Sequence, residues 1–270
     1  MRPLVMGVLN VTPDSFFDGG RYLDSASAIA RGLAMVEEGA DVVDVGGESS
    51  RPGSEPVDEH EELRRVLPVI AALSGAVRVS IDTMKPAVAQ AAVDSGATIL
   101  NDVARRLTEV AARTGVGLIL MHMRGTPRDM QVDPRYDSVA DEVFGELRSN
   151  AAAARSTGVR EVYVDPGIGF GKTLEHNLIL LRSLPDLVSS GEDVVIGTSR
   201  KSFIGRVLAD KDASPLGVDE RFEGSLASAV WAMAAGVAMV RVHDVKETAD
   251  AAHLFGDRDE RLAVMSGGRP

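Results

Sequence analysis

A repeated unit constrains the fold of this chain more than any other feature of its sequence. Each copy has a helix-like segment rich in alanine and charged residues, then a glycine, then a short and nearly continuous apolar run. A glycine at a helix end favours a left-handed cap, and an unbroken apolar run is typical of a parallel strand buried on both faces. The glycines in this position are Gly39, Gly96, Gly115, Gly158, Gly191 and Gly236. The unit therefore predicts alternating helices and parallel strands.

Two further apolar runs, at 4–10 and 77–82, raise the number of predicted strands to eight. The other six strands are predicted at 41–46, 97–102, 116–121, 161–165, 193–198 and 238–243. These alternations fill the 270 residues without a linker or a low-complexity segment. We therefore predict one α/β domain over residues 1–270, a closed (β/α)8 TIM barrel rather than an open doubly wound sheet.

Three insertions into the regular alternation are expected near the carboxyl ends of the strands. Extended loops at 11–20 and 46–56 follow the first two predicted strands and carry glycines and prolines. The first loop contains Phe16 and Phe17, which can either pin the loop to the protein or contact a ligand, so this loop is a lid candidate. A short extra helix is predicted at 202–208, ahead of a main helix at 220–235. Its free amide groups would lie where barrels often bind an anion.

Charge and cysteine content exclude several classes of protein. A net charge of -11 argues against a nucleic-acid surface or an anionic membrane as partner. The absence of cysteine excludes disulfides, thiol catalysis and thiolate zinc sites. No apolar run approaches the ~18 residues of a membrane helix, and the first apolar segment is too short for a signal peptide. We expect a soluble cytoplasmic protein.

The segment 165–173, Asp-Pro-Gly-Ile-Gly-Phe-Gly-Lys-Thr, imitates a nucleotide-binding loop. Pro166 stands where a phosphate loop needs its first glycine, and Lys172 stands where a dinucleotide fingerprint needs its third. We therefore interpret the segment as a strand that ends in a functional carboxylate, Asp165. Phe170 is predicted to form a wall of the pocket. Lys172 is interpreted as a charge behind the site or on the surface, rather than a phosphate ligand.

The ends of the predicted strands are polar, as a barrel active site requires, although solvent exposure alone also favours polar residues there. Asp82, Asn101 and Asp165 offer acceptors and an amide, which suit a flat ligand edge bearing N–H donors, such as an aminopyrimidinone. Lys201, Arg241 and His243 offer cationic or donor groups, which suit a phosphate or diphosphate. Asn10 lies beside them on the first strand, and its oxygen suits Mg²⁺.

Other chemistries have weaker support in the sequence. The histidines include no pair at metal-binding helical spacing, so a zinc site is not expected. His122, flanked by methionines, is interpreted as a packing and orienting residue. Ser199 lacks the surroundings of a nucleophile elbow. Lys201 is chemically able to form a Schiff base, but its neighbours favour anion or carbonyl binding.

Eight motifs, spread over about residues 4 to 250, occur in the order of one known family. They are Asn10-Val-Thr-Pro-Asp-Ser-Phe16, Asp44-Val-Gly-Gly-Glu48-Ser-Ser-Arg51-Pro52-Gly53, Ser80-Ile-Asp82-Thr83, Asn101-Asp102-Val103, Met121-His-Met-Arg-Gly125, Asp165 to Thr173, Ser199-Arg-Lys201-Ser202 and Arg241-Val-His243-Asp244. The chain strongly resembles dihydropteroate synthase, a folate-pathway transferase with a pterin-binding barrel. The pterin-ring motifs are the less specific part, because related methyltransferase domains share them.

The resemblance implies a role for each matching residue. Pterin binding is implied for Asp82, Asn101, Asp165, Lys201 and Phe170, and catalysis for Lys201, Asp82 and Asn10. The diphosphate and Mg²⁺ are expected at Asn10, Arg241 and His243, with Asn10 as the metal ligand. Binding of p-aminobenzoate is implied for Phe16, Ser50, Arg51, Pro52 and Ser202. The family also implies a homodimer and a target of sulfonamides.

The implied reaction joins 6-hydroxymethyl-7,8-dihydropterin diphosphate to p-aminobenzoate, whose aniline nitrogen replaces diphosphate at the exocyclic carbon. Stabilisation of the leaving group, without a covalent enzyme intermediate, is the expected mechanism. Two alternatives remain at this point, a pterin-binding methyltransferase module and a non-catalytic pterin-binding relative. The second is supported only by a departure from the family pattern, a shortened connection at Ala104-Arg105-Arg106.

Overall fold

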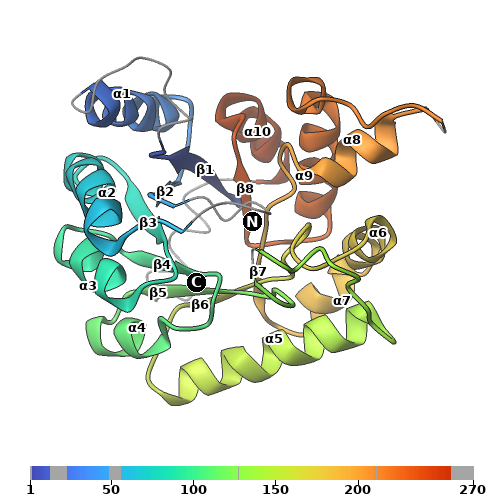
Figure 1. The fold of residues 1–270 in the computed structure, drawn as a ribbon, viewed down its shortest axis with the longest axis horizontal. Coiled ribbons are helices and arrows are strands. Elements are labelled where there is room, and N and C mark those ends of the chain that lie inside the picture. The colour runs from blue at the N-terminus through green and yellow to red at the C-terminus, as the bar shows by residue number, and fades with distance from the viewer. Residues whose placement is uncertain (1, 13–22, 49–55, 127, 211, 257–270) are drawn as a thin grey trace.

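Eight parallel strands pair in the order of the sequence and close into a barrel, as predicted (Figure 1). The computed structural model describes residues 2–12, 23–48, 56–126, 128–210 and 212–256. The strands are β1 Leu4–Asn10, β2 Val42–Gly46, β3 Arg78–Asp82, β4 Ile99–Asp102, β5 Gly117–Met121, β6 Val162–Asp165, β7 Asp193–Ile196 and β8 Met239–Val242. The last strand pairs with the first, with Val5 opposite Val240. The open-sheet alternative is thereby excluded.

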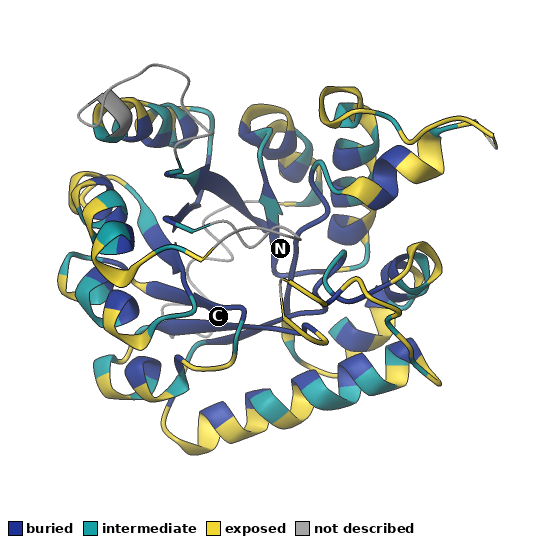
Figure 2. Cartoon of the chain, viewed as in Figure 1, coloured by how far each residue is buried: buried dark blue, intermediate teal, exposed yellow. Residues whose placement is uncertain are grey.

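Helices surround the barrel and turn their buried faces to the strands (Figure 2). They are α1 Leu23–Glu37, α2 Glu59–Leu73, α3 Pro86–Asp94, α4 Thr108–Thr114, α5 Val139–Ser156, α6 Leu174–Arg182, α7 Leu184–Ser189, α8 Ser202–Leu208, α9 Phe222–Ala234 and α10 Val245–Ala252. Two short 3-10 helices are η2 Val218–Glu220 and η3 His253–Phe255. The extra helix after the seventh strand has the predicted bounds. Among the described residues, no helix is both long and apolar enough to cross a membrane.

The six repeat glycines all adopt the left-handed conformation that the sequence predicts. Their φ angles are 101° at Gly39, 110° at Gly96, 75° at Gly115, 102° at Gly158, 87° at Gly191 and 89° at Gly236. A side chain at such an angle would meet the following carbonyl, which is why glycine serves there. Each glycine ends one helix and turns the chain into the next strand. The repeat therefore fixes where in the sequence each helix ends and the next strand begins.

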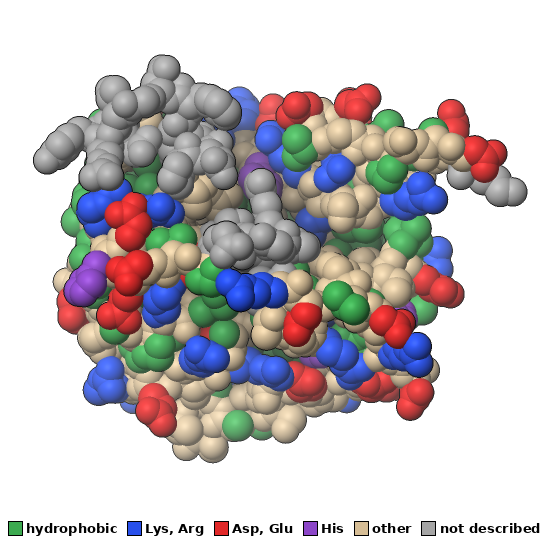
Figure 3. All heavy atoms as spheres, in the orientation of Figure 1, with side chains coloured by type: hydrophobic (Ala, Val, Ile, Leu, Met, Phe, Trp, Pro, Cys, Tyr) green, Lys and Arg blue, Asp and Glu red, His purple; other side chains and the backbone are tan. Residues whose placement is uncertain are grey.

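Apolar side chains fill the interior of the barrel below its mouth, whereas polar side chains lie at the carboxyl ends of the strands. One buried cluster lies inside the barrel and consists of Leu4, Met6, Val42, Ile99, Ile119, Tyr163, Val195, Ala238 and Met239. A larger cluster lies between the strands and the helices. The barrel is therefore a packed core rather than a pore, and a ligand can enter only from the mouth. On the face in Figure 3, acidic and basic side chains are interspersed.

Candidate active site

The barrel mouth brings together most of the polar residues that the sequence predicts. Asp82 and Asn101 are register partners at the ends of β3 and β4, and Asp165 ends β6. All three side chains are buried. Burial raises the pKa of Asp82 and of Asp165, whereas Arg241 opposes the rise at the first and Lys201 at the second. The mouth therefore offers several acceptors in a poorly hydrated place.

Arg241 lies among these carboxylates rather than apart from them. Its Nε donates to Asp44 Oδ2 at 2.7 Å, and its Nη2 donates to Asp82 Oδ2 at 3.0 Å. The sequence predicted one group of acceptors and another of cations, whereas the structure joins the two groups through this guanidinium. The sequence placed Asp44 among the polar residues near the strand ends but assigned it no binding or catalytic role. The one available signal was its place in the motif that leads to Glu48, two residues before the end of its strand.

Lys201 lies at the same mouth, just after β7. Its Nζ donates to the carbonyl of Ile168 and lies 4.7 Å from the ring centroid of Phe170. Burial lowers the pKa of Lys201 to about 8, and Asp165 opposes this fall. Phe170 thus lies beside Lys201, and Lys201 contacts the loop that carries Asp165.

Two glycines keep space open beside the charged groups. A methyl group on Gly46 would lie 3.6 Å from Asn10 Oδ1 and 3.7 Å from Asp82 Cβ. A methyl group on Gly197 would lie 3.8 Å from Lys201 Nζ and 3.7 Å from Arg241 Cβ. Asn10 therefore lies close to Asp82, and Lys201 lies close to Arg241.

The segment 165–173 is held against the end of β5. Gly167, at φ 65°, donates its N–H to Asp165 Oδ1 at 2.7 Å, and a methyl group there would lie 1.9 Å from the carbonyl oxygen of His122. The hydroxyl of Tyr136 donates to the carbonyl of Gly171 at 2.9 Å. Such close backbone packing explains why glycines alternate here, and the glycines place Asp165 rather than cradle a phosphate.

Lys172 anchors this segment from inside the protein. Its Nζ lies 3.0 Å from His122 Nδ1, 2.9 Å from the carbonyl of Phe170 and 3.3 Å from the carbonyl of His122. Those three acceptors match the three N–H donors of an ammonium group. Lys172 is buried, so of its two predicted positions the one behind the site is confirmed and the surface one is wrong. His122 is an orienting residue, as interpreted, and burial lowers its pKa to about 3.

The burial of Lys172 predicts a pH dependence of stability. Burial lowers its pKa to about 7, whereas the pKa of a lysine in the unfolded chain is about 10.4. Between these pH values the unfolded chain binds the extra proton, so this residue makes the free energy of unfolding rise with pH, by at most ~1.4 kcal/mol per pH unit. Lys172→Met should remove the contribution. Urea unfolding of both proteins at pH 6, 8 and 10 checks it. A difference between the two proteins that stays constant over this range would contradict it.

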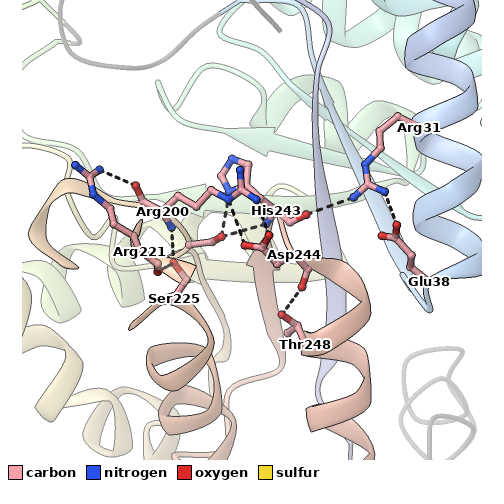
Figure 4. A network of polar contacts seen from close by, with 9 residues as sticks. Arg31, Glu38, Arg200, Arg221, Ser225, His243, Asp244 and Thr248 are labelled. Carbon is pink, nitrogen blue, oxygen red and sulfur yellow. Dashed lines mark hydrogen bonds and ion pairs between the residues drawn. The ribbon is translucent and has the colours of Figure 1, made fainter. Parts of the chain in front are cut away.

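The loops after β7 and β8 are tied together by a network of polar contacts (Figure 4). Ser199 Oγ accepts the N–H of His243 at 3.1 Å and lies 3.0 Å from its Nδ1. Arg200, in a left-handed conformation at φ 59°, pairs with Asp244 at 2.5 Å. Arg31 on α1 reaches the carbonyl of His243 at 3.5 Å. The network orients His243 beside Arg241, on the side predicted for an anion.

The short connection after β4 is built around Asp102. Its carboxylate accepts the N–H groups of Ala104 at 3.2 Å, Arg106 at 3.0 Å and Leu107 at 2.8 Å. Arg105 adopts a left-handed φ of 59° within this turn. The shortened loop that the sequence indicated is therefore an ordered turn, and Asp102 supports it rather than a ligand.

Several predicted residues cannot be compared with the structure or lie at the margin of the site. Phe16, Ser50, Arg51 and Pro52 lie outside the described residues. Ser202 is exposed at the first position of α8. The described residues contain no cluster of three histidine or acidic side chains able to hold a metal.

The chain is similar over most of its length to a family model and to known proteins. A family model described as "Pterin binding enzyme" matches residues 6–243. The dihydropteroate synthase of Escherichia coli strain K12 is 44% identical over 259 residues, which cover 93% of this chain and 89% of that protein. A crystal structure of the Yersinia pestis dihydropteroate synthase with a sulfonamide drug has a TM-score of 0.85 at 39% identity, and covers 98% of this chain and 95% of that one. The Xanthomonas albilineans dihydropteroate synthase in complex with 7,8-dihydropteroate has a TM-score of 0.82 at 40% identity, and covers 98% and 94%.

Proposed function

The chain belongs to the dihydropteroate synthase family of pterin-binding enzymes, and from this premise we propose how its barrel mouth works. The enzyme condenses 6-hydroxymethyl-7,8-dihydropterin diphosphate with p-aminobenzoate, and forms 7,8-dihydropteroate and diphosphate in folate biosynthesis. The observation that carries the residue assignments is the convergence of Asp82, Asn101, Asp165 and Lys201 at one end of the barrel. Arg241 and His243 lie beside these residues. Their presence disfavours a pterin-binding module that needs only the ring site.

The pterin ring is bound by the carboxylates and the amide. Asp82 and Asp165 accept hydrogen bonds from the N–H groups of the aminopyrimidinone edge, and Asn101 adds an amide between β3 and β5. Lys201 donates to a ring acceptor, since its Nζ lies over Phe170 at 4.7 Å and so next to the plane that a flat ligand would occupy. Phe170 packs against the ring.

The diphosphate lies on the side of β1 and β8. Arg241 and His243 bind its oxygens, and Asn10 offers one neutral oxygen to Mg²⁺. This donor set fits an ion that arrives with the substrate, because Mg²⁺ prefers oxygen ligands and keeps several waters beside phosphates. When bound, Mg²⁺ neutralises the negative charge of the diphosphate.

The chemistry follows from stabilisation of the leaving group. Arg241 and His243 hold the diphosphate as the carbon–oxygen bond breaks, and Lys201 and Asp82 orient the pterin so that the aniline nitrogen attacks the exocyclic carbon. The described mouth supplies orientation and charge, and the reaction requires no covalent enzyme intermediate. Ser202 at the start of α8, together with Phe16, Ser50, Arg51 and Pro52, binds p-aminobenzoate. A sulfonamide competes for the same place.

Two further assignments concern the protein as a whole. We propose a homodimer, as the family resemblance implies. Half-exposed apolar side chains on neighbouring helices support it, namely Leu174 on α6, Val207 and Leu208 on α8, and Trp231 on α9. We also propose a cytoplasmic location, because a chain without cysteine suits a reducing compartment. Sedimentation analysis tests the first and cell fractionation the second.

Release of diphosphate that depends on p-aminobenzoate tests the proposed function. The purified protein is mixed with dihydropterin diphosphate and Mg²⁺, and the released diphosphate is measured before and after the amine is added. We expect release only with both substrates and a loss of release when Mg²⁺ is chelated. Pterin binding without release would support a non-catalytic relative, and no pterin binding would overturn the assignment of the barrel mouth.

A further inference from the structure

We infer that Asp44 is a positioning residue that sets the orientation of the Asn101 amide and of the Arg241 guanidinium. The inference rests on the proposed function, because it concerns how Asn101 meets the pterin. Asp44 does not need to touch the ligand, and its role is to decide which atoms of its neighbours do.

Asp44 joins three strands of the barrel through one oxygen atom. The residue lies on β2 with a side chain fully removed from solvent. Its Oδ2 accepts Asn101 Nδ2 from β4 at 3.0 Å and Arg241 Nε from β8 at 2.7 Å. Two donors from strands on opposite sides of β2 thus meet at a single acceptor.

The contact to Asn101 determines which end of that amide serves the ligand. An asparagine has a donor end and an acceptor end, and rotation by 180° exchanges them. In this structure the donor end faces Asp44, so Oδ1 is left as an acceptor. The rotated amide would set Asn101 Oδ1 against Asp44 Oδ2, two acceptors without a proton in a buried place. Asp44 therefore makes Asn101 match its neighbours Asp82 and Asp165, which are also acceptors.

The contact to Arg241 divides one guanidinium between two carboxylates. Nε belongs to Asp44 at 2.7 Å, and Nη2 belongs to Asp82 at 3.0 Å. A guanidinium can pair with one carboxylate through two parallel hydrogen bonds. Because Asp44 accepts the hydrogen bond from Nε, Arg241 does not use Nε and Nη2 together to pair with Asp82. Asp82 consequently keeps capacity to accept hydrogen bonds from a ligand.

An exchange of the two side chains tests the role without removing either polar group. The variants are Asp44→Asn, Asn101→Asp, and both on one chain, and the probe is 6-hydroxymethylpterin, which has the ring but no diphosphate. Calorimetry measures its affinity for each protein. We expect each single variant to bind about tenfold or more weakly. Asp44→Asn removes the charge that pairs with Arg241 and no longer forces the donor end of the Asn101 amide toward position 44. Asn101→Asp sets two carboxylates in contact. We expect the double variant to bind more tightly than either, because the amide at position 44 can donate to the carboxylate at position 101.

A matched control separates positioning from general loss of stability. Asp41 is also a fully buried aspartate of this barrel, paired with Arg2 at 3.0 Å at the opposite end from the mouth. Asp41→Asn should lower the melting temperature and leave the affinity for 6-hydroxymethylpterin unchanged. Melting temperatures of all variants are recorded beside the affinities.

The outcomes are distinct. A wild-type protein that does not bind the probe would contradict the proposed function. Wild-type binding with unchanged affinity in Asp44→Asn, or losses that simply add in the double variant, would overturn the inference about Asp44. If Asp44→Asn alone does not fold, the double variant is compared with Asn101→Asp, and an affinity no higher than that of Asn101→Asp overturns it equally.

Discussion

Gly167→Ala is expected to lower the free energy of unfolding by about 2–5 kcal/mol and to abolish turnover. The new methyl group would lie 1.9 Å from the carbonyl oxygen of His122, and the residue has a φ of 65°. A left-handed alanine costs roughly 1–2 kcal/mol, and overpacking adds about 1–3 kcal/mol. Relief of the clash requires the segment that carries Asp165 to move away from β5. Urea unfolding and the diphosphate-release assay measure the two effects.

Gly191→Ala provides the matched control for this variant. Gly191 also has a positive φ, 87°, but a methyl group there meets no atom within 4 Å. It should therefore pay only the conformational cost of about 1–2 kcal/mol and keep its activity. Equal losses of stability in the two variants would show that close packing at His122 does not matter.

Lys201→Met is expected to reduce kcat/KM for dihydropterin diphosphate by about 100-fold or more while the protein stays folded. The substitution keeps the length of the side chain and removes the charge that lies beside Asp165 and over Phe170. Removal of one preorganised donor from an active site typically costs about 100- to 1,000-fold. Steady-state kinetics with each substrate varied in turn gives the result, and far-UV circular dichroism checks the fold.

Lys246→Met removes a lysine of the same kind from the surface of α10, where it pairs with Asp250 at 2.8 Å. An exposed pair of this type contributes little, so the kinetics should match those of the wild type. Should Lys201→Met also keep wild-type kcat/KM, the role assigned to Lys201 would be wrong.

The architecture could be predicted from the sequence because its determinants are local. Each glycine that ends a helix precedes a run such as Val42 to Val45, and both signals lie within a few residues. The extra helix at Ser202–Leu208 was predictable for the same reason. The carboxyl ends of parallel strands meet at one edge of a barrel, so the convergence of Asp82, Asn101 and Asp165 followed from the strand assignment alone.

The partners chosen inside the mouth could not be predicted in the same way. Arg241 pairs with Asp44, 197 positions earlier in the chain, and no local pattern indicates that choice. Lys172 was open to two interpretations, because its motif does not reveal whether the side chain is buried behind the site or exposed on the surface. Asp102 supports the turn after β4 by accepting backbone N–H groups. Because every residue but proline carries such a group, the sequence around Asp102 does not indicate this role.

Closure of the barrel by β1 and β8 has a consequence for biosynthesis of the enzyme. Pairing of Val5 with Val240 joins positions near the two ends of the described chain, so it must await synthesis of nearly all of it. Contacts so distant in sequence form late and slowly. Asn10 and Arg241 lie on those two strands, and the carboxylate Asp44 has its cation only after closure. A ribosome-bound chain that lacks β8 therefore carries Asp44 and Asp82 without the Arg241 guanidinium that pairs with both of them. Closure of the barrel and pairing of these two carboxylates with their cation are therefore completed in one step.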